Sequence, residues 1–248
     1  MMDDPTEQTP QDPSTGPTVP EEPTEHALRT DDGVTLGARR YDPPGGAAPV
    51  AVTLIHGATA VPQDYYDRYA RWLAAHGHRV LTYDYRGIGR SRPESLRRFR
   101  ATMSDWARHD ARAAFAWQRA QQDELGVPGY VVGHSFGGQM IGLLDEYRQA
   151  DGVVLVASQM GFWRRWPVAQ WPRLALLWYG LVPAATALTG YLPGALGLRT
   201  DLPGGVAREW SRWCRHPDYL AGHHADAAPR FARFDRPTLL FTFDDDDY

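Results

Sequence analysis

The chain has 248 residues, 43% of them apolar, which is enough to bury a full core as one domain with an insertion. Its net charge is −4 and it contains no lysine, which argues against the concentrated basic face of a nucleic-acid-binding protein. Cys214 is the single cysteine, so an intrachain disulfide is excluded; because no signal peptide is recognisable either, we expect a cytoplasmic protein.

The chain opens with a polar segment and a predicted hairpin. Residues 1–25 are rich in proline, threonine and acidic side chains and nearly free of large apolar ones, so we expect a disordered tail. Two strand-like runs follow, 26–30 and 34–41. They flank the turn signal Asp31-Asp32-Gly33, which predicts an antiparallel hairpin at the edge of a sheet.

The next residues alternate between strand and helix patterns. The almost continuously apolar run 50–55 is typical of a strand covered by helices on both faces, and it ends at His56-Gly57-Ala58. Further strands are expected at 79–83, 130–133 and 152–156, and helices at 63–75, from a Ser104 cap to 123, and at 136–149. This alternation predicts an α/β fold, a mostly parallel sheet flanked by helices, with its site at the carboxyl ends of the strands.

The alternation stops between residues 158 and 228. We interpret this stretch as a helical cap inserted over the site, between core residues 26–157 and a last core segment, 229–248, that holds a strand and an acidic loop. Aromatic residues commonly line ligand clefts, although each tryptophan here could instead only join the cap to the sheet. Six of the nine tryptophans lie in it: Trp163, Trp166, Trp171, Trp178, Trp210 and Trp213.

One part of the predicted cap has the length of a membrane span. Residues 174–198 contain no charged side chain, and 25 residues can cross a bilayer. Glycines and prolines nevertheless divide this run into short helical pieces. We therefore expect no membrane span.

The strongest motif is Gly133-His134-Ser135-Phe136-Gly137-Gly138. It follows an apolar strand and precedes a helical pattern, the context of a nucleophile elbow, in which a strained turn lifts a serine hydroxyl out of the sheet. Gly133 and Gly137 leave room where a side chain would collide with the tight strand and helix backbones. Ser135 is the predicted nucleophile.

These motifs make the sequence resemble an α/β-hydrolase-fold serine hydrolase, of the serine aminopeptidase S33-like kind. The resemblance implies that the backbone N–H groups of Phe136 and Ala58 form the oxyanion hole. It also implies that Asp246 is the acid of the triad, with Asp245 as the alternative. His56 is expected to shape the oxyanion loop through hydrogen bonds, and His134 to be structural.

The triad order of this fold is serine, acid, histidine, and no histidine follows the acidic run that ends at Tyr248. We therefore expect a chain truncated before the last strand and the catalytic histidine. The cap histidines His216, His223 and His224 are a weak alternative base. His223 and His224, with Asp226, also form only a weak metal motif, so neither a metal nor a cofactor is expected.

Two functions remain open on the sequence. The first is a serine hydrolase that cleaves a small or medium apolar ester, thioester or amide through an acyl-Ser135 intermediate, with a small acyl compound as its partner. The alternative is a non-catalytic ligand-binding protein on a degenerate or truncated hydrolase fold. The sequence indicates neither the acyl length nor the oligomeric state.

Overall fold

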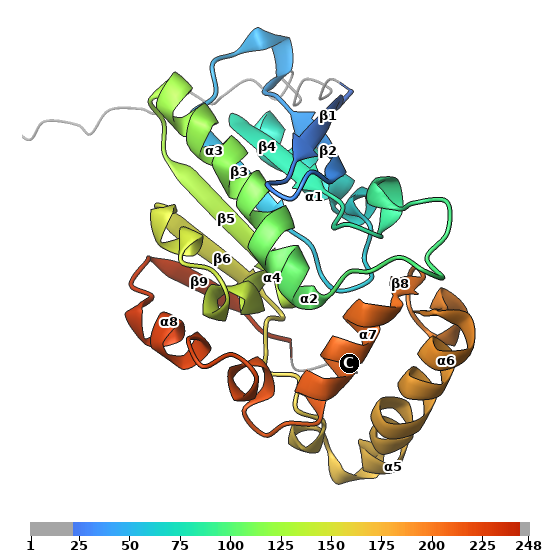
Figure 1. Ribbon diagram of the computed structural model, residues 1–248. Helices are drawn as coiled ribbons and strands as arrows, with labels where there is room; N and C mark the ends of the chain where they lie inside the picture. The colour runs from blue at the N-terminus through green and yellow to red at the C-terminus, as the bar shows by residue number, and fades with distance from the viewer. Residues whose placement is uncertain (1–21, 244–248) are drawn as a thin grey trace, which may run out of the picture.

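The computed structural model describes residues 22–243 of the chain. Its centre is a seven-stranded sheet in the order β1-β2-β4-β3-β5-β6-β9 (Figure 1). The first two strands form the predicted antiparallel hairpin at one edge, β2 is also antiparallel to β4, and all other neighbours are parallel. The strands are Thr24–Arg29 (β1), Thr35–Tyr41 (β2), Ala51–His56 (β3), His78–Tyr83 (β4), Gly129–His134 (β5), Gly152–Val156 (β6) and Thr238–Phe241 (β9).

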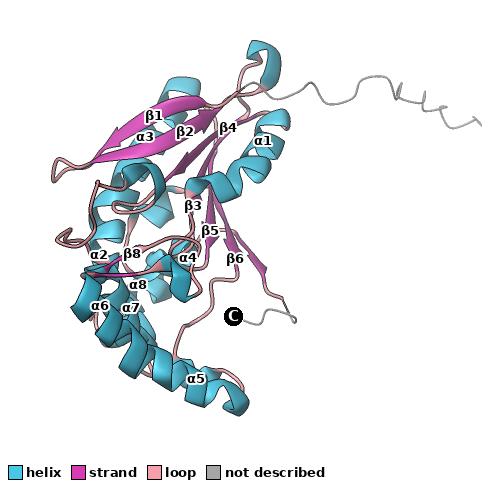
Figure 2. Ribbon diagram, turned by 90° about the vertical axis from the view of Figure 1, so that its right-hand side faces the viewer, coloured by secondary structure: helices cyan, strands magenta, loops and turns pink. Residues whose placement is uncertain are grey.

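Helices cover both faces of this sheet, which confirms the predicted fold class. Helix α1, Asp67–Ala75, and helix α3, Arg112–Leu125, lie on opposite faces (Figure 2). All six residues of β3 are buried between them, as its apolar run predicts. The predicted helix from residue 63 begins instead as a 3₁₀ turn, Gln63–Tyr66, which leads into α1.

The long helix on the α3 face begins two residues earlier than predicted. Thr102 rather than Ser104 is its cap: the Thr102 side chain accepts a hydrogen bond from the Asp105 N–H, and the Asp105 carboxylate accepts one from the Thr102 N–H. This capping box starts α2, Met103–Asp105, which continues through a wider turn, Trp106–Ala111, into α3. Gly126, at φ 67°, ends the helix.

The helix that follows β5 is much shorter than predicted. Helix α4 spans only Phe136–Gln139, and a 3₁₀ turn, Met140–Gly142, and a second one, Glu146–Gln149, replace the rest of the expected helix. After α4, Gly142 lies close to the ring of Phe231 from α8, Ala227–Arg233, where an added Cβ atom would come within 2.4 Å.

The residues between β6 and β9 are mainly helical, and we keep the name cap for residues 158–228. Helices α5 (Trp171–Ala175), α6 (Val182–Thr189) and α7 (Gly204–Cys214) lie beyond the carboxyl ends of the parallel strands (Figures 1 and 2). A short two-stranded sheet of β7, Tyr191–Leu192, and β8, Leu202–Pro203, connects α6 to α7.

Helix α7 is anchored to the core by a buried carboxylate. Glu209 accepts hydrogen bonds from the Ser104 N–H at 2.9 Å and the Ser104 hydroxyl at 2.8 Å, and it thereby joins the cap to α2. Only 8% of Glu209 is exposed. Because a buried carboxylate is costly unless its oxygens are paired, these two hydrogen bonds favour one position of the cap on the core.

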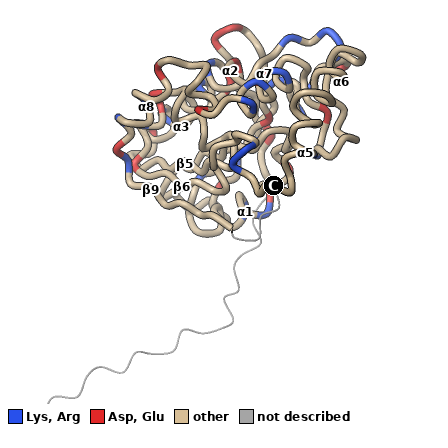
Figure 3. The backbone as a smooth tube through the Cα atoms, turned by 90° about the horizontal axis from the view of Figure 1, so that it is seen from below, with Lys and Arg blue, Asp and Glu red and all other residues tan. Residues whose placement is uncertain are grey.

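Neither charged side chains nor long apolar helices are concentrated in one part of the molecule. Seen from the cap side in Figure 3, basic and acidic positions are interspersed around the molecule. In the uncharged run 174–198, α5 continues through a wider turn, Leu176–Leu181, into α6, so the helix passes through Gly180 and Pro183; strand β7 and a 3₁₀ turn, Gly194–Leu196, follow it. No helix formed by residues 22–243 is both long enough and apolar enough to cross a membrane.

Candidate active site

Ser135 sits at a strained turn between β5 and α4. Its backbone angles are φ 51° and ψ −115°, a conformation that costs a non-glycine residue energy and that tertiary contacts must maintain. The Ser135 N–H donates to the Val156 carbonyl at 2.9 Å, and the Ser135 carbonyl accepts from the Gly138 and Gln139 N–H groups. Strand, strained serine and helix therefore follow one another as in a nucleophile elbow.

Two glycines give this turn the space it needs. A Cβ atom on Gly133 would lie 2.7 Å from the Gly138 Cα atom, and one on Gly137 would lie 2.2 Å from the His56 carbonyl oxygen. Both contacts are with backbone atoms, which cannot rotate away as a side chain can. A side chain at either position would thus collide with the backbone in this fold, as the sequence predicts.

The residue after the serine presents a free backbone donor. Phe136 is the first residue of α4, where helix geometry leaves the N–H without an intrahelical acceptor, and this N–H donates to no other described residue. The Phe136 ring is buried against Tyr85, Trp106 and Trp213. These contacts hold Phe136 in place and leave its N–H available as an oxyanion donor.

The second predicted donor, the Ala58 N–H, is already occupied. It donates to the Tyr66 hydroxyl at 2.7 Å, while the carbonyl of the same peptide, that of Gly57, accepts from the Tyr85 hydroxyl at 3.1 Å. The loop is therefore shaped by Tyr66 and Tyr85. Sequence reasoning assigned this role to His56, and it placed Tyr66 only inside the predicted helix 63–75.

His56 lies in the core instead of reaching the loop with its side chain. Its Nδ1 atom is 2.7 Å from the Tyr83 hydroxyl, and its ring packs against Phe115 and Tyr147. Complete burial lowers the pKa of His56 to about 3, so the imidazole stays neutral at physiological pH. His56 meets the elbow through its backbone, which pairs with Gly133 and lies close to Gly137.

His134 and the cap histidines are engaged elsewhere. His134 Nδ1 is 2.9 Å from the Tyr66 hydroxyl, and its ring stacks on Tyr65. The rings of His216 and His223 lie together on the cap, and His224 Nε2 is 3.4 Å from the Ser104 hydroxyl. Within residues 22–243, which contain all nine histidines, none is hydrogen-bonded to Ser135.

A pocket lies between Ser135 and the cap. Ser135, Thr59 and Gln139 line its core side, and the cap side is mainly aromatic and aliphatic, with Leu174 and Leu177 among its residues. Four of the six cap tryptophans also line it: Trp163, Trp166, Trp178 and Trp210. Of the other two, Trp213 fits the alternative role, because it packs on Phe136 of the core, whereas Trp171 packs on Trp163 within the cap.

Strand β9, the last described strand, ends at the edge of the sheet where Ser135 lies. Strand β9 is parallel to β6, with Phe241 paired to Val156, whose carbonyl also accepts from the Ser135 N–H. Asp246, the predicted acid, and its alternative Asp245 lie outside the described residues.

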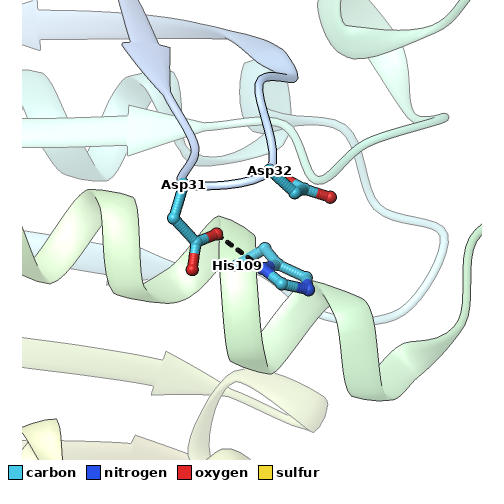
Figure 4. Close-up of side chains that lie close together, drawn as sticks. All are labelled: Asp31, Asp32 and His109. Carbon is cyan, nitrogen blue, oxygen red and sulfur yellow. Dashed lines mark hydrogen bonds and ion pairs between the residues drawn. The ribbon is translucent and has the colours of Figure 1, made fainter.

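Three side chains of types that bind metal ions lie close together, and the sequence analysis did not identify them. Asp31, Asp32 and His109 place one ligand atom each within 4.8 Å of one another, and no other such group occurs in the described part of the chain (Figure 4). Asp32 already accepts two hydrogen bonds from Arg86, which lower the pKa of its carboxyl group, and His109 pairs with Asp31 at 2.5 Å. The group is thus an ion-pair cluster.

The geometry agrees with comparisons to known proteins. The family described as "Serine aminopeptidase, S33" matches residues 47–202, more than half of the chain. Among solved structures, brefeldin A esterase, a bacterial homologue of human hormone-sensitive lipase, is similar at 17% identity and a TM-score of 0.57, over 94% of this chain and 63% of that one. The α/β hydrolase GrgF from Penicillium sp. sh18 is similar at 17% identity and a TM-score of 0.54, over 89% of both chains.

These identities establish a shared fold only, and the chain spans less than two thirds of the esterase's length. No curated protein matches the sequence. The family match, the mostly parallel sheet and its flanking helices nevertheless agree with one another. The chain belongs to the serine aminopeptidase S33 family and has the α/β-hydrolase fold.

Proposed function

We propose that this protein is a serine hydrolase that cleaves a small or medium apolar ester, thioester or amide through an acyl-Ser135 intermediate. One observation carries the proposal: Ser135 is held in a strained elbow at the mouth of an aromatic pocket. A strained, non-glycine conformation persists only where the surroundings impose it, and such strain concentrates at functional sites.

The reaction starts with attack of Ser135 Oγ on the substrate's carbonyl carbon, while a histidine acting as general base takes the hydroxyl proton and then gives it to the leaving group. The carbonyl oxygen becomes an oxyanion, and the Phe136 N–H is free to donate to it; one such donor contributes about 3 kcal/mol to transition-state stabilisation. Collapse of the tetrahedral intermediate expels the alcohol, thiol or amine and leaves the acyl-enzyme, which water then hydrolyses. Asp246 is our proposal for the acid that orients the base.

The pocket supports an apolar acyl group as the part of the substrate that is recognised. Ser135, Thr59 and Gln139 line its core side, whereas tryptophan and leucine side chains form most of the cap wall, with Gln159, Gln170 and Arg173 as its polar members. Transferring an apolar chain from water to such a wall contributes about 0.8 kcal/mol per buried methylene group.

Hydrolysis of p-nitrophenyl esters of increasing chain length tests this proposal in the full-length protein. We expect turnover that is lost in Ser135→Ala and retained in the control Ser95→Ala, which removes a hydroxyl from an exposed serine outside the pocket. A fluorophosphonate probe should label the native protein and the control but not Ser135→Ala. Equal rates in all three proteins, with binding of an apolar ligand retained, would instead support the non-catalytic alternative.

A further inference from the structure

The peptide between Gly57 and Ala58 is held at both ends by tyrosine hydroxyls. The Tyr85 hydroxyl donates to its carbonyl at 3.1 Å, and the Tyr66 hydroxyl accepts from its N–H at 2.7 Å. The same Tyr66 hydroxyl is 2.9 Å from Nδ1 of His134, the residue before the nucleophile. Tyr66 therefore bridges the two loops, after β3 and after β5, that flank the expected oxyanion site.

This arrangement removes the Ala58 N–H from direct use. An amide carries one hydrogen, and here that hydrogen is already in a short hydrogen bond. An oxyanion placed beside the Ala58 N–H must either displace the Tyr66 hydroxyl from that N–H or be bound by the hydroxyl. We propose that the Tyr66 hydroxyl, and not the Ala58 N–H, donates the second hydrogen bond to the oxyanion; this inference rests on the proposed hydrolase function.

Displacement of Tyr66 is opposed by its packing. Only 8% of the residue is exposed, its ring meets those of Tyr65 and His134 edge to face, and a Cβ atom on Gly57 would come within 3.1 Å of it. The turn that carries Tyr66 is fixed as well. The buried Asp84 carboxylate accepts from both the backbone N–H and the side-chain amide of Gln63, the first residue of that turn.

The hydrogen-bond inventory of a phenol suits the proposed role. The Tyr66 oxygen has two lone pairs and one hydrogen, and the Ala58 N–H fills one lone pair. When His134 carries its hydrogen on Nδ1, that hydrogen fills the second lone pair, and the phenolic O–H is left to donate to the oxyanion. Burial raises the pKa of Tyr66, so the hydroxyl keeps its hydrogen throughout the neutral range.

Tyr66→Phe tests this inference, with Tyr65→Phe as the matched control. Both variants remove one phenolic oxygen from neighbouring rings that contact His134, but the structure shows no hydrogen bond between the Tyr65 hydroxyl and a described residue. With a p-nitrophenyl ester, we expect Tyr66→Phe to lower kcat by about 10²- to 10³-fold with KM within about threefold, as for loss of an oxyanion donor. Tyr65→Phe should keep the native kcat.

A second readout separates catalysis from folding. An alkyl boronic acid, which forms a tetrahedral adduct on a nucleophilic serine, should bind Tyr66→Phe more weakly by a factor similar to the loss in kcat, at unchanged melting temperature. Native kcat in Tyr66→Phe would overturn the inference, and a higher kcat would show that the hydroxyl only blocks Ala58. If Ser135→Ala also kept native activity, the proposed function itself would fail; activity that needs Ser135 but not Tyr66 would refute this inference alone.

Discussion

Substituting alanine for Gly137 should distort the turn that presents Ser135. The new Cβ atom would lie 2.2 Å from the carbonyl oxygen of His56 and 2.7 Å from the carbonyl carbon of His56. Both distances are shorter than 3.0 Å, below which Cβ contacts essentially never occur in proteins. His56 cannot retreat, because it ends the fully buried central strand β3 and pairs with Gly133 of β5. The turn itself must therefore move.

The cost follows from this geometry. Overpacking a well-packed site typically costs 1–3 kcal/mol, and a clash between backbone atoms belongs at the upper end, about 3 kcal/mol. In a chain of this length that corresponds to a fall of roughly 6–12 °C in Tm. A shift of the nucleophile by about 1 Å should also lower kcat by about 100-fold.

Thermal unfolding and ester hydrolysis measure the two effects in one preparation. Gly180→Ala is the control, because its Cβ atom would meet only the end of the Leu176 side chain, at 3.3 Å, and alanine favours a helix over glycine by about 1 kcal/mol. The control should match or exceed the native Tm. A Gly137→Ala protein with native Tm and native activity would refute the reasoning.

Three further predictions concern side chains that hold the fold together. Arg86→Met leaves the fully buried Asp110 carboxylate without its ion pair and should cost about 3–5 kcal/mol, measured by urea unfolding; a cost under about 1 kcal/mol would contradict this. Arg86 lowers the pKa of Asp32 in the folded protein. The stability that this pair contributes is therefore complete above the pKa of Asp32 in the unfolded chain, about 3.9, and is lost as pH falls through its lower pKa in the folded protein. Asp32→Asn should therefore flatten the acid limb of the stability profile, and an unchanged limb would argue against the pair. Glu209→Gln weakens the hydrogen bonds to Ser104 by about 1–3 kcal/mol and should increase hydrogen exchange in α7, with native exchange as the contrary result.

The parts of the site that lie close together in the sequence were predictable. The elbow depends on a strained Ser135 and on the absence of side chains at Gly133 and Gly137. All three residues lie within five positions, so the motif alone predicts the turn. The hairpin and the parallel strands were also predictable, because local apolar periodicity and turn residues determine which segments become strands. The predicted length of the helix after Ser135 was wrong: α4 ends at Gln139, and the 3₁₀ turn that follows packs against Phe231, about ninety positions further along the chain.

The sequence by itself determined the fold class and the strained turn at Ser135, the proposed nucleophile, because both follow from patterns that repeat or close within a few residues. Only the tertiary structure decided which groups surround that nucleophile. It placed the Tyr66 hydroxyl on the Ala58 N–H, buried His56 away from the loop it was expected to shape, and joined Glu209 to Ser104 across 105 positions. The physical reason is that a hydrogen bond depends on where two atoms meet in space, and packing of the whole chain sets that position.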